Sequence, residues 1–339
     1  MNGINYLQYE YLIQLTSAYW KSQVIFTAIE LDIFTTLDNK CLTAQELART
    51  IHANEQATEK ILNALVSLDL LTKQEKYYQN SEISNNYLTK GKPFYLGDAI
   101  HHFHNIAENW EMLSHTVKTG EAVVLKDLPE DVDPHDLKDF ITAMHNIASV
   151  KAQDICTAIC LENPRNMLDL AGGPGTYSIE FVKKYPELHT VIFDLEHVTK
   201  LTHGFIQSSG LQERIKVQIG NCLEDDFGSN CYDTILVSNL LHIYNPENNI
   251  KILKKCWKAL QNEGTLIIHE FVLDETKTHP QFAALFSLNM LIGTQEGASY
   301  SETEYRSWLD TTGFHRITRT DLQSNSSLIV GKKEHVIPG

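Results

Sequence analysis

Residues 167–178 read MLDLAGGPGTYS, an apolar run that leads into a glycine-rich turn and then into a helical pattern. Glycines at such a junction allow positive φ angles and let the backbone approach a ligand closely. The first N–H groups of the helix that follows are free to bind an anionic group. The stretch therefore predicts a strand, a ligand-binding loop and a helix, in that order.

Further apolar runs follow this strand at regular intervals. They cover residues 190–194, 215–219, 234–238 and 265–271, with helical patterns between them. Strands that alternate with helices form a parallel, doubly wound sheet, whose ligand binds at the carboxyl ends of the strands. A capped helix at 301–312 breaks the alternation, and the strand-like runs 315–322 and 327–331 predict a terminal antiparallel pair. The predicted fold class is α/β, a Rossmann-like sheet with this antiparallel pair at its end.

The amino-terminal part has a different pattern, because its apolar residues recur at helical spacing. Thr43 and Glu46 have the spacing of a capping box and predict a helix start. A second helix at 56–68 precedes a short hairpin around Tyr77-Tyr78. The order of helix, helix and hairpin is that of a winged-helix domain.

These patterns divide the chain into three parts. They are a mainly α winged-helix domain at 1–100, linking helices at 101–160, and an α/β domain with the glycine loop at 161–339. Gly120 and an Asp/Pro-rich turn at 128–134 separate the linking helices, and Pro164 marks the boundary before the sheet.

The composition excludes several classes of protein. Of 339 residues, 42% are hydrophobic and 21% charged, and the formal net charge is −15, which is typical of a soluble globular protein. The acidic balance argues against nucleic-acid binding, which depends on Lys and Arg. Neither a secretory signal nor an apolar run of about 18 residues is evident, so we expect a cytoplasmic protein with no membrane partner. The six cysteines lack zinc spacing, and we predict no metal.

An acid that follows the glycine loop identifies the class of ligand. Asp194 ends the second strand, 19 positions after Gly175, where a carboxylate can accept both hydroxyls of a ribose. A dinucleotide site would have a third glycine where this chain has Ser178, and Asp169 would repel a diphosphate. S-adenosylmethionine, which has a ribose, an ammonium and a carboxylate but no phosphate, fits better. The alternative is that the glycines only form a tight turn and that Asp194 only caps the next helix.

Six segments, in this order, carry a family resemblance. They are LDLAGGPGT, VIFDLEHV, VQIGNCLEDDF, ILVSNLLHIY, LIIHEF and LNMLIGTQEGASYSETEY. With them the chain resembles, over nearly its whole length, the small-molecule S-adenosylmethionine-dependent O-methyltransferases, which include plant caffeate-type enzymes, acetylserotonin methyltransferase and bacterial natural-product methylases. The resemblance implies that the winged-helix domain at 1–100 is a dimerisation domain that forms an intertwined homodimer. It implies that the linking helices at 101–160 contribute to the pocket of a small-molecule acceptor. It also implies that 161–339 is the catalytic domain, which binds S-adenosylmethionine and releases S-adenosylhomocysteine.

The resemblance also implies which residues bind the cofactor. Asp194 would bind the ribose, Leu195 would contact the adenine, and the glycine loop would line the methionine part. The full set is Asp169, Gly172, Gly173, Gly175, Asp194, Leu195, Asn221, Cys222 and Ser238. Asn221 stands where the family usually has Asp, although its carbonyl can still accept a hydrogen bond from the adenine amino group. Ser238 stands where plant members have a Lys near the cofactor.

His242 follows the fourth strand at the position of the family's general base, and Glu270 matches an acid that orients it. A histidine is mostly unprotonated near neutral pH, so it can take a proton from a hydroxyl. The family commonly reads His-Asp-Trp, whereas Ile243-Tyr244 follow the histidine here. Ser299 replaces a second orienting Glu of the plant members, and Glu302 is close by in sequence.

The acceptor pocket is expected from helix faces that could form an apolar wall. Its candidates are Met144, His145, Phe282, Phe286, Asn289 and Met290, with weaker support for His104, Trp110 and Tyr300.

Two other functions stay open. The same fold could methylate carbon or nitrogen, or perform non-methylating chemistry. The second alternative is a transcriptional regulator that binds DNA through the winged helix. Glu55 and Glu59 at the start of its candidate recognition helix oppose phosphate contacts.

Overall fold

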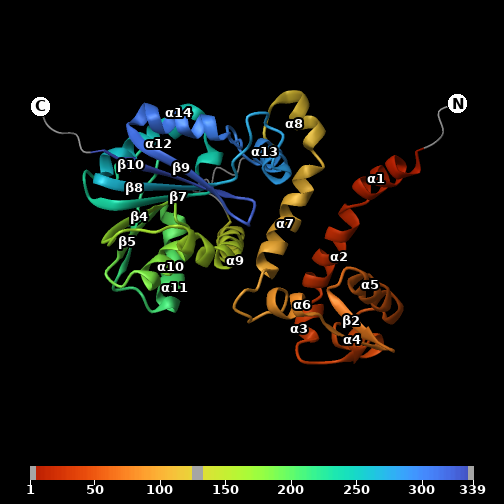
Figure 1. The fold of residues 1–339 in the computed structure, drawn as a ribbon. Helices are drawn as coiled ribbons and strands as arrows, with labels where there is room; N and C mark the ends of the chain where they lie inside the picture. The colour runs from red at the N-terminus through yellow and green to blue at the C-terminus, as the bar shows by residue number, and fades with distance from the viewer. Residues whose placement is uncertain (1–4, 124–132, 335–339) are drawn as a thin grey trace, which may run out of the picture. The chain divides into compact units, whose positions relative to one another are not determined.

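A computed structural model describes residues 5–123 and 133–334 (Figure 1). The chain divides into two compact units, Met1–Asn105 and Ile106–Gly339. The boundary between the units lies close to the predicted end of the winged-helix domain, and residues 106–160 of the predicted linking part are in the second unit. Most of the Asp/Pro-rich turn lies outside the described residues. Its end, Asp133, caps the helix that begins at Pro134.

The first unit is a helical domain with a small antiparallel sheet. Its helices are α1 (Tyr6–Thr16), α2 (Tyr19–Glu30), α3 (Ile33–Thr36), α4 (Ala44–Thr50), α5 (Glu55–Ser67), α6 (Glu82–Tyr87) and the first part of α7 (Gly97–Trp110). Its strands β1 (Leu42–Thr43), β2 (Leu71–Gln74) and β3 (Tyr77–Asn80) pair in the order β1-β3-β2. Thr43 and Glu46 form the predicted capping box of α4, and β2 with β3 form the predicted hairpin.

The second unit is built around a seven-stranded sheet. Its strands are β4 (Asn166–Leu170), β5 (His189–Asp194), β6 (Ile215–Ile219), β7 (Tyr232–Ser238), β8 (Leu260–Glu270), β9 (Phe314–Asp321) and β10 (Ser327–Lys333), in the order β6-β5-β4-β7-β8-β10-β9. The first five are parallel, as predicted, and β10 is antiparallel to both β8 and β9. The terminal pair therefore joins the sheet through its last strand.

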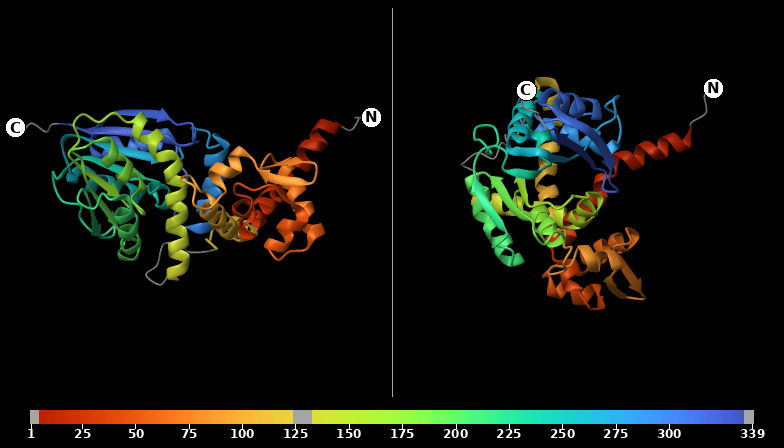
Figure 2. Two further views of the ribbon diagram at one scale, coloured as in Figure 1. Left: turned by 90° about the horizontal axis from the view of Figure 1, so that it is seen from below. Right: turned by 60° about the vertical axis from the view of Figure 1, so that its left-hand side comes forward.

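Helices cover both faces of this sheet (Figures 1 and 2). The helices of the unit are α8 (Leu113–Thr119), α9 (Pro134–Ala158), α10 (Thr176–Lys184), α11 (Glu196–Ser209), α12 (Pro246–Ala259), α13 (Gln281–Gly293) and α14 (Glu302–Thr312). Apolar residues of α12 and α14 pack with the strands in one core, and those of α9, α10 and α11 pack with them in another. Burial on two faces explains why the parallel strands read as continuous apolar runs.

Candidate active site

The glycine loop joins β4 to α10 at the carboxyl edge of the sheet. Gly175 has φ 74°, a conformation that glycine adopts without strain, and it forms the amino-terminal cap of α10. A Cβ on this residue would lie 2.4 Å from the Ile192 side chain, so the helix packs closely on β5. At Gly172 a Cβ would lie 2.7 Å from the carboxyl carbon of Asp169. Gly175 is thus required for the packing of the helix on β5, and Gly172 for the close approach of the loop to Asp169.

Asp194 fixes the position of this loop from the end of β5. Its Oδ2 accepts a hydrogen bond from the Gly173 N–H at 2.8 Å, and its Oδ1 accepts one from the Leu195 N–H at 2.7 Å. Burial raises the pKa of Asp194 to about 6, although both hydrogen bonds favour the ionised form. Each carboxylate oxygen keeps a further lone pair, so Asp194 can still accept hydroxyl groups.

Asp169 is fully buried within β4. Its Oδ2 accepts a hydrogen bond from the Ser178 hydroxyl at 2.8 Å, whereas its Oδ1 has no partner in the described part of the chain. Burial, reinforced by the charge of Asp194, raises the pKa of Asp169 to about 6. A buried acceptor without a partner costs free energy, and a ligand with a cationic donor would satisfy it.

A cavity of about 970 Å³ opens beside these two acids. Its walls include most of the predicted cofactor residues, namely Asp169, Gly172, Gly173, Asp194, Leu195, Asn221, Cys222 and Ser238, together with Met144 of α9. Gly175 does not line it. The volume suits a cofactor-sized ligand, and two further buried atoms in its walls, His197 Nε2 and Asn239 Oδ1, lack a partner among the described residues. These residues fit a ligand with several polar groups, such as S-adenosylmethionine.

Two cofactor candidates have hydrogen-bond partners within the protein. The Asn221 Oδ1 accepts a bond from the Leu223 N–H at 2.9 Å and so shapes its own loop, with one lone pair left for a ligand. The Ser238 hydroxyl lies 2.9 Å from Nδ1 of His269, whose Nε2 lies 2.8 Å from the Ser326 hydroxyl. Burial lowers the pKa of His269 to about 4, so this histidine is a neutral support for Ser238.

His242 lies in a short 3-10 helix (Leu241–Ile243) that follows β7. Its Nδ1 is 2.8 Å from Oε2 of Glu270, the last residue of β8, and both side chains are buried. The other oxygen, Oε1, accepts a hydrogen bond from the Leu241 N–H at 2.9 Å. A carboxylate only accepts hydrogen bonds, so Nδ1 of His242 carries the proton and Nε2 keeps a free lone pair. That nitrogen can act as a base.

One ring of a phenylalanine cluster contacts this histidine. The ring of Phe286 in α13 meets the His242 ring edge-on, with centroids 4.9 Å apart. Phe271 contacts Phe286 at 4.7 Å and Phe282 at 4.9 Å. Phe282 is 43% exposed, which leaves room for a ligand against the cluster. Two of the predicted pocket residues, Phe282 and Phe286, therefore lie together beside the candidate base.

The other predicted pocket residues have different surroundings. Asn289 accepts a hydrogen bond from the Trp110 indole at 3.1 Å, and Met290 is buried in α13. His145 does not line the cavity, because its Nδ1 lies 2.8 Å from the Thr176 hydroxyl and its ring packs on Phe205. Of the weaker candidates, Tyr300 donates its hydroxyl proton to the Tyr244 carbonyl, and His104 stacks on Phe26.

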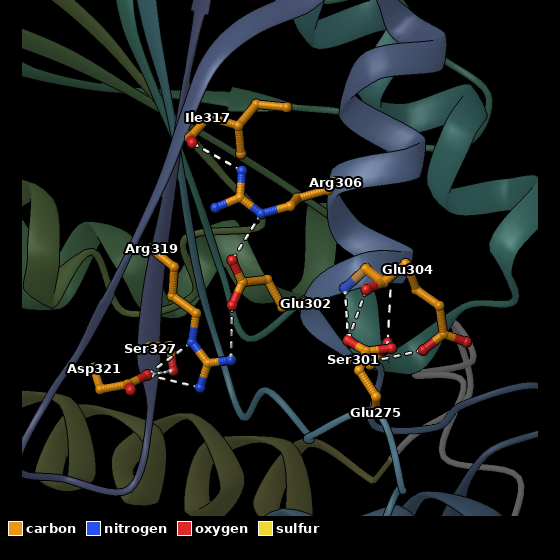
Figure 3. Close-up of polar contacts among 10 residues, drawn as sticks. Glu275, Ser301, Glu302, Glu304, Arg306, Ile317, Arg319, Asp321 and Ser327 are labelled. Atoms are coloured by element: carbon orange, nitrogen blue, oxygen red, sulfur yellow. Dashed lines mark hydrogen bonds and ion pairs between the residues drawn. The ribbon is translucent and has the colours of Figure 1, made fainter.

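Glu302 does not take the place of the second orienting acid. Figure 3 shows its carboxylate between Arg306 and Arg319, with hydrogen bonds of 2.7 Å and 3.3 Å to them. Arg319 also binds Asp321, so Glu302 belongs to an ion-pair network between α14 and β9. The buried hydroxyl of Ser299 has no partner among the described residues.

Sequence reasoning missed several residues that line the cavity or the aromatic cluster. Asn239 has φ 52°, a conformation that Asn tolerates better than most residues, and its position directly after a strand could have drawn attention to it. Tyr177 and His197 line the cavity, and Phe271 lies at the centre of the aromatic cluster. All four lie within the segments quoted above, but the sequence alone did not single them out, because distant strands and helices bring their side chains to the site.

No helix within residues 5–123 and 133–334 is long and apolar enough to cross a membrane, and no group of side chains there is arranged to hold a metal ion.

The chain is similar to known proteins along most of its length. Residues 110–315 match the O-methyltransferase domain, and residues 13–90 match the O-methyltransferase dimerisation domain. A 3-hydroxy-5-methyl-1-naphthoate 3-O-methyltransferase of Streptomyces sahachiroi is 30% identical over 309 residues, 89% of this chain and 88% of that protein. The N,N-dimethyltransferase OxyT of Streptomyces rimosus is 26% identical and covers 95% of this chain and 96% of its own length. The crystal structure of human N-acetylserotonin methyltransferase in complex with SAM matches with a TM-score of 0.88 at 25% identity, over 98% of this chain and 99% of that one. The chain therefore belongs to the O-methyltransferase family.

Proposed function

We propose that this enzyme transfers a methyl group from S-adenosylmethionine to a hydroxyl of a small aromatic molecule, with His242 as the general base. The observation that carries the proposal is the buried contact between His242 and Glu270, made at the same sheet edge as the cofactor-sized cavity. The relative that methylates a naphthoate supports an aromatic acceptor.

The cavity residues have separate roles in holding the cofactor. Asp194 accepts hydrogen bonds from the ribose hydroxyls, and Leu195 packs against the adenine. The unpartnered Oδ1 of Asp169 accepts a hydrogen bond from the ammonium group. When bound, S-adenosylmethionine supplies an electrophilic methyl group on its sulfonium. The protein adds alignment of the reacting atoms, which is a large part of the catalysis of such a displacement.

His242 removes the proton of the acceptor hydroxyl with its Nε2, which makes the oxygen a stronger nucleophile. Glu270 holds the tautomer that leaves Nε2 unprotonated and stabilises the imidazolium that forms. Such a proton transfer contributes a factor of about 10²–10⁴ in rate. Phe282 and Phe286 form the apolar wall against which the acceptor ring lies.

Methylation of nitrogen or carbon is the second candidate. Ile243 follows His242 in the chain and lines the cavity. It stands where the family commonly has Asp, so this position offers no carboxylate. OxyT, a relative of similar length, is named an N,N-dimethyltransferase. The two candidates predict different products from the same incubation.

We further propose that the protein is a homodimer formed through its first unit. The dimerisation domain matches residues 13–90, and α1 buries none of its residues in the described chain. Leu7 is 83% exposed and Leu12 57%, which a partner chain would cover. A cytoplasmic location stays a prediction of the sequence.

Incubation of the purified protein with S-adenosylmethionine and a panel of phenols, anilines and carbon acids tests the reaction. We expect release of S-adenosylhomocysteine together with an aryl methyl ether, which is heavier than the starting phenol by one CH₂ unit. NMR of the product distinguishes an oxygen-bound methyl group from one on nitrogen or carbon. Products methylated only on nitrogen or carbon would contradict the proposed function.

A further inference from the structure

Lys151 in α9 is a partly buried cation without an ion-pair partner in the described part of the chain. Its Nζ lies 5.4 Å from the centroid of the Phe271 ring. Asp154, one turn further along the helix, makes no ion pair with it. Burial lowers the pKa of Lys151. A desolvated ammonium group is costly unless an anion pairs with it.

Lys151 follows cavity residues on the same helix and contacts the aromatic cluster, although it is not itself among the residues that line the cavity. It lies seven residues after Met144 and three after Ala148, and both of these line the cofactor cavity. Residues at these spacings share one face of a helix. The ammonium group of Lys151 lies over the ring of Phe271. That ring contacts Phe286, which in turn contacts His242.

The cavity is lined mainly by acidic residues among its charged side chains, so a cation close to it affects which acceptors can bind. The chain has a formal net charge of −15, and Asp169, Asp194, Glu196 and Glu296 line the cavity with Lys200 as the only Lys or Arg among its lining residues in the described chain. An anionic acceptor would be repelled by this field. A cation held over an aromatic ring offsets the repulsion at one point, and the ring contact limits the movement of its head group.

We infer that Lys151 binds a carboxylate of the acceptor, so that the preferred acceptor is an aromatic hydroxy acid rather than a neutral phenol. This inference rests on the proposed function and names its substrate class. The aromatic ring of the acceptor lies against the phenylalanine cluster, its hydroxyl faces His242 and its carboxylate pairs with the ammonium of Lys151.

Matched probes test the inference by binding, without turnover. We would titrate 6-hydroxy-2-naphthoate, 3-hydroxy-2-naphthoate and 2-naphthol into full-length protein saturated with S-adenosylhomocysteine. The three share the rings and the hydroxyl, and the two acids place the carboxylate far from it or next to it. We expect at least one acid to bind about tenfold or more tightly than 2-naphthol, as a charged hydrogen bond allows.

Two substitutions test whether Lys151 is responsible for that preference. Lys151→Met keeps an unbranched apolar stem and should abolish the preference for the acid, whereas Lys151→Arg should keep most of it. Both variants should bind 2-naphthol and S-adenosylhomocysteine as the wild type does, which also shows that they are folded. The inference is overturned if neither acid binds more tightly than 2-naphthol, or if the preference persists in Lys151→Met. Failure of the wild type to bind S-adenosylhomocysteine would instead overturn the proposed function and this inference with it.

Discussion

Glu270 Oε2 lies 2.8 Å from Nδ1 of His242, although the two residues are 28 positions apart in the chain. The contact exists because β7 and β8 are parallel neighbours, with Ser238 paired to His269, so that their carboxyl ends meet. Glu270 also accepts a hydrogen bond from the Leu241 N–H and thereby fixes the turn that carries the histidine. The orientation of the His242 ring, the proposed base, is thus set by the sheet.

His242→Gln tests the base. We predict that kcat for methyl transfer falls by about 10²–10⁴-fold, because the proton of the hydroxyl has no acceptor. The affinity for S-adenosylhomocysteine should not change, since His242 does not line the cofactor cavity. Steady-state kinetics and calorimetry on the same preparations measure both quantities. An equal loss of cofactor affinity would indicate a structural role for the histidine.

Glu270→Gln tests the orienting acid. The amide is nearly isosteric, but it does not hold the histidine tautomer as a carboxylate does, and we expect kcat to fall by about 10²-fold or more. Glu302→Gln is the matched control, because its carboxylate pairs with Arg306 and Arg319. Its kcat should stay at the wild-type value. Similar losses of kcat in both variants would contradict the assignment of Glu270.

Asp194 should make the stability of the ligand-free protein depend on pH. Its pKa in the folded protein is raised to about 6 by burial, above the value of about 4 in an unfolded chain. Protonation therefore stabilises the fold below pH 4, and this contribution is lost as the pH rises through 6. Relative to wild type, the free energy of unfolding of Asp194→Asn should rise between pH 4 and pH 7, by up to about 3 kcal/mol. Urea unfolding across this range measures it, and a difference independent of pH would refute the explanation.

Gly172→Ala tests the close approach at the loop. The added methyl group would meet the Asp169 carboxyl group at 2.7 Å, and overpacking of this kind costs about 1–3 kcal/mol. We expect weaker binding of S-adenosylhomocysteine. Gly204→Ala in α11 is the control, because nothing lies within 4 Å of its added Cβ. Wild-type affinity in both variants would show that Gly172 has no special role.

Substitution of exposed apolar residues in α1 tests the dimer. Leu7→Glu with Leu12→Glu places charges on a helix that buries no residue in the described chain. Light scattering should show a dimer for the wild type and a monomer for the double variant, because the charges would be buried against a partner. A wild-type monomer, or a dimer in both proteins, would contradict this prediction.

The features that the sequence predicted well are local. The glycine loop, the capping boxes at Thr43 and Ser301 and the strand periods each depend on residues a few positions apart. The position of Asp194 beside the loop could be predicted because its distance from the loop is fixed by one strand-helix-strand unit.

The features that the sequence did not predict depend on contacts between distant segments. The pairing of Glu302 with Arg319 requires β9 to lie beside α14, and the hydrogen bond of His145 to Thr176 requires α9 to pack on α10. The unpartnered oxygen of Asp169 and the environment of Lys151 likewise depend on burial that no local pattern encodes.

Isothermal titration of S-adenosylhomocysteine into the wild type and into Asp194→Asn tests the central claim most directly, because it needs no acceptor. The account predicts saturable binding at one site per chain in the wild type. It also predicts affinity that is weaker by about tenfold or more in the variant, as expected for the loss of charged hydrogen bonds to the ribose. No binding to the wild type, or equal affinity in both proteins, would contradict a cofactor site built on the glycine loop and Asp194.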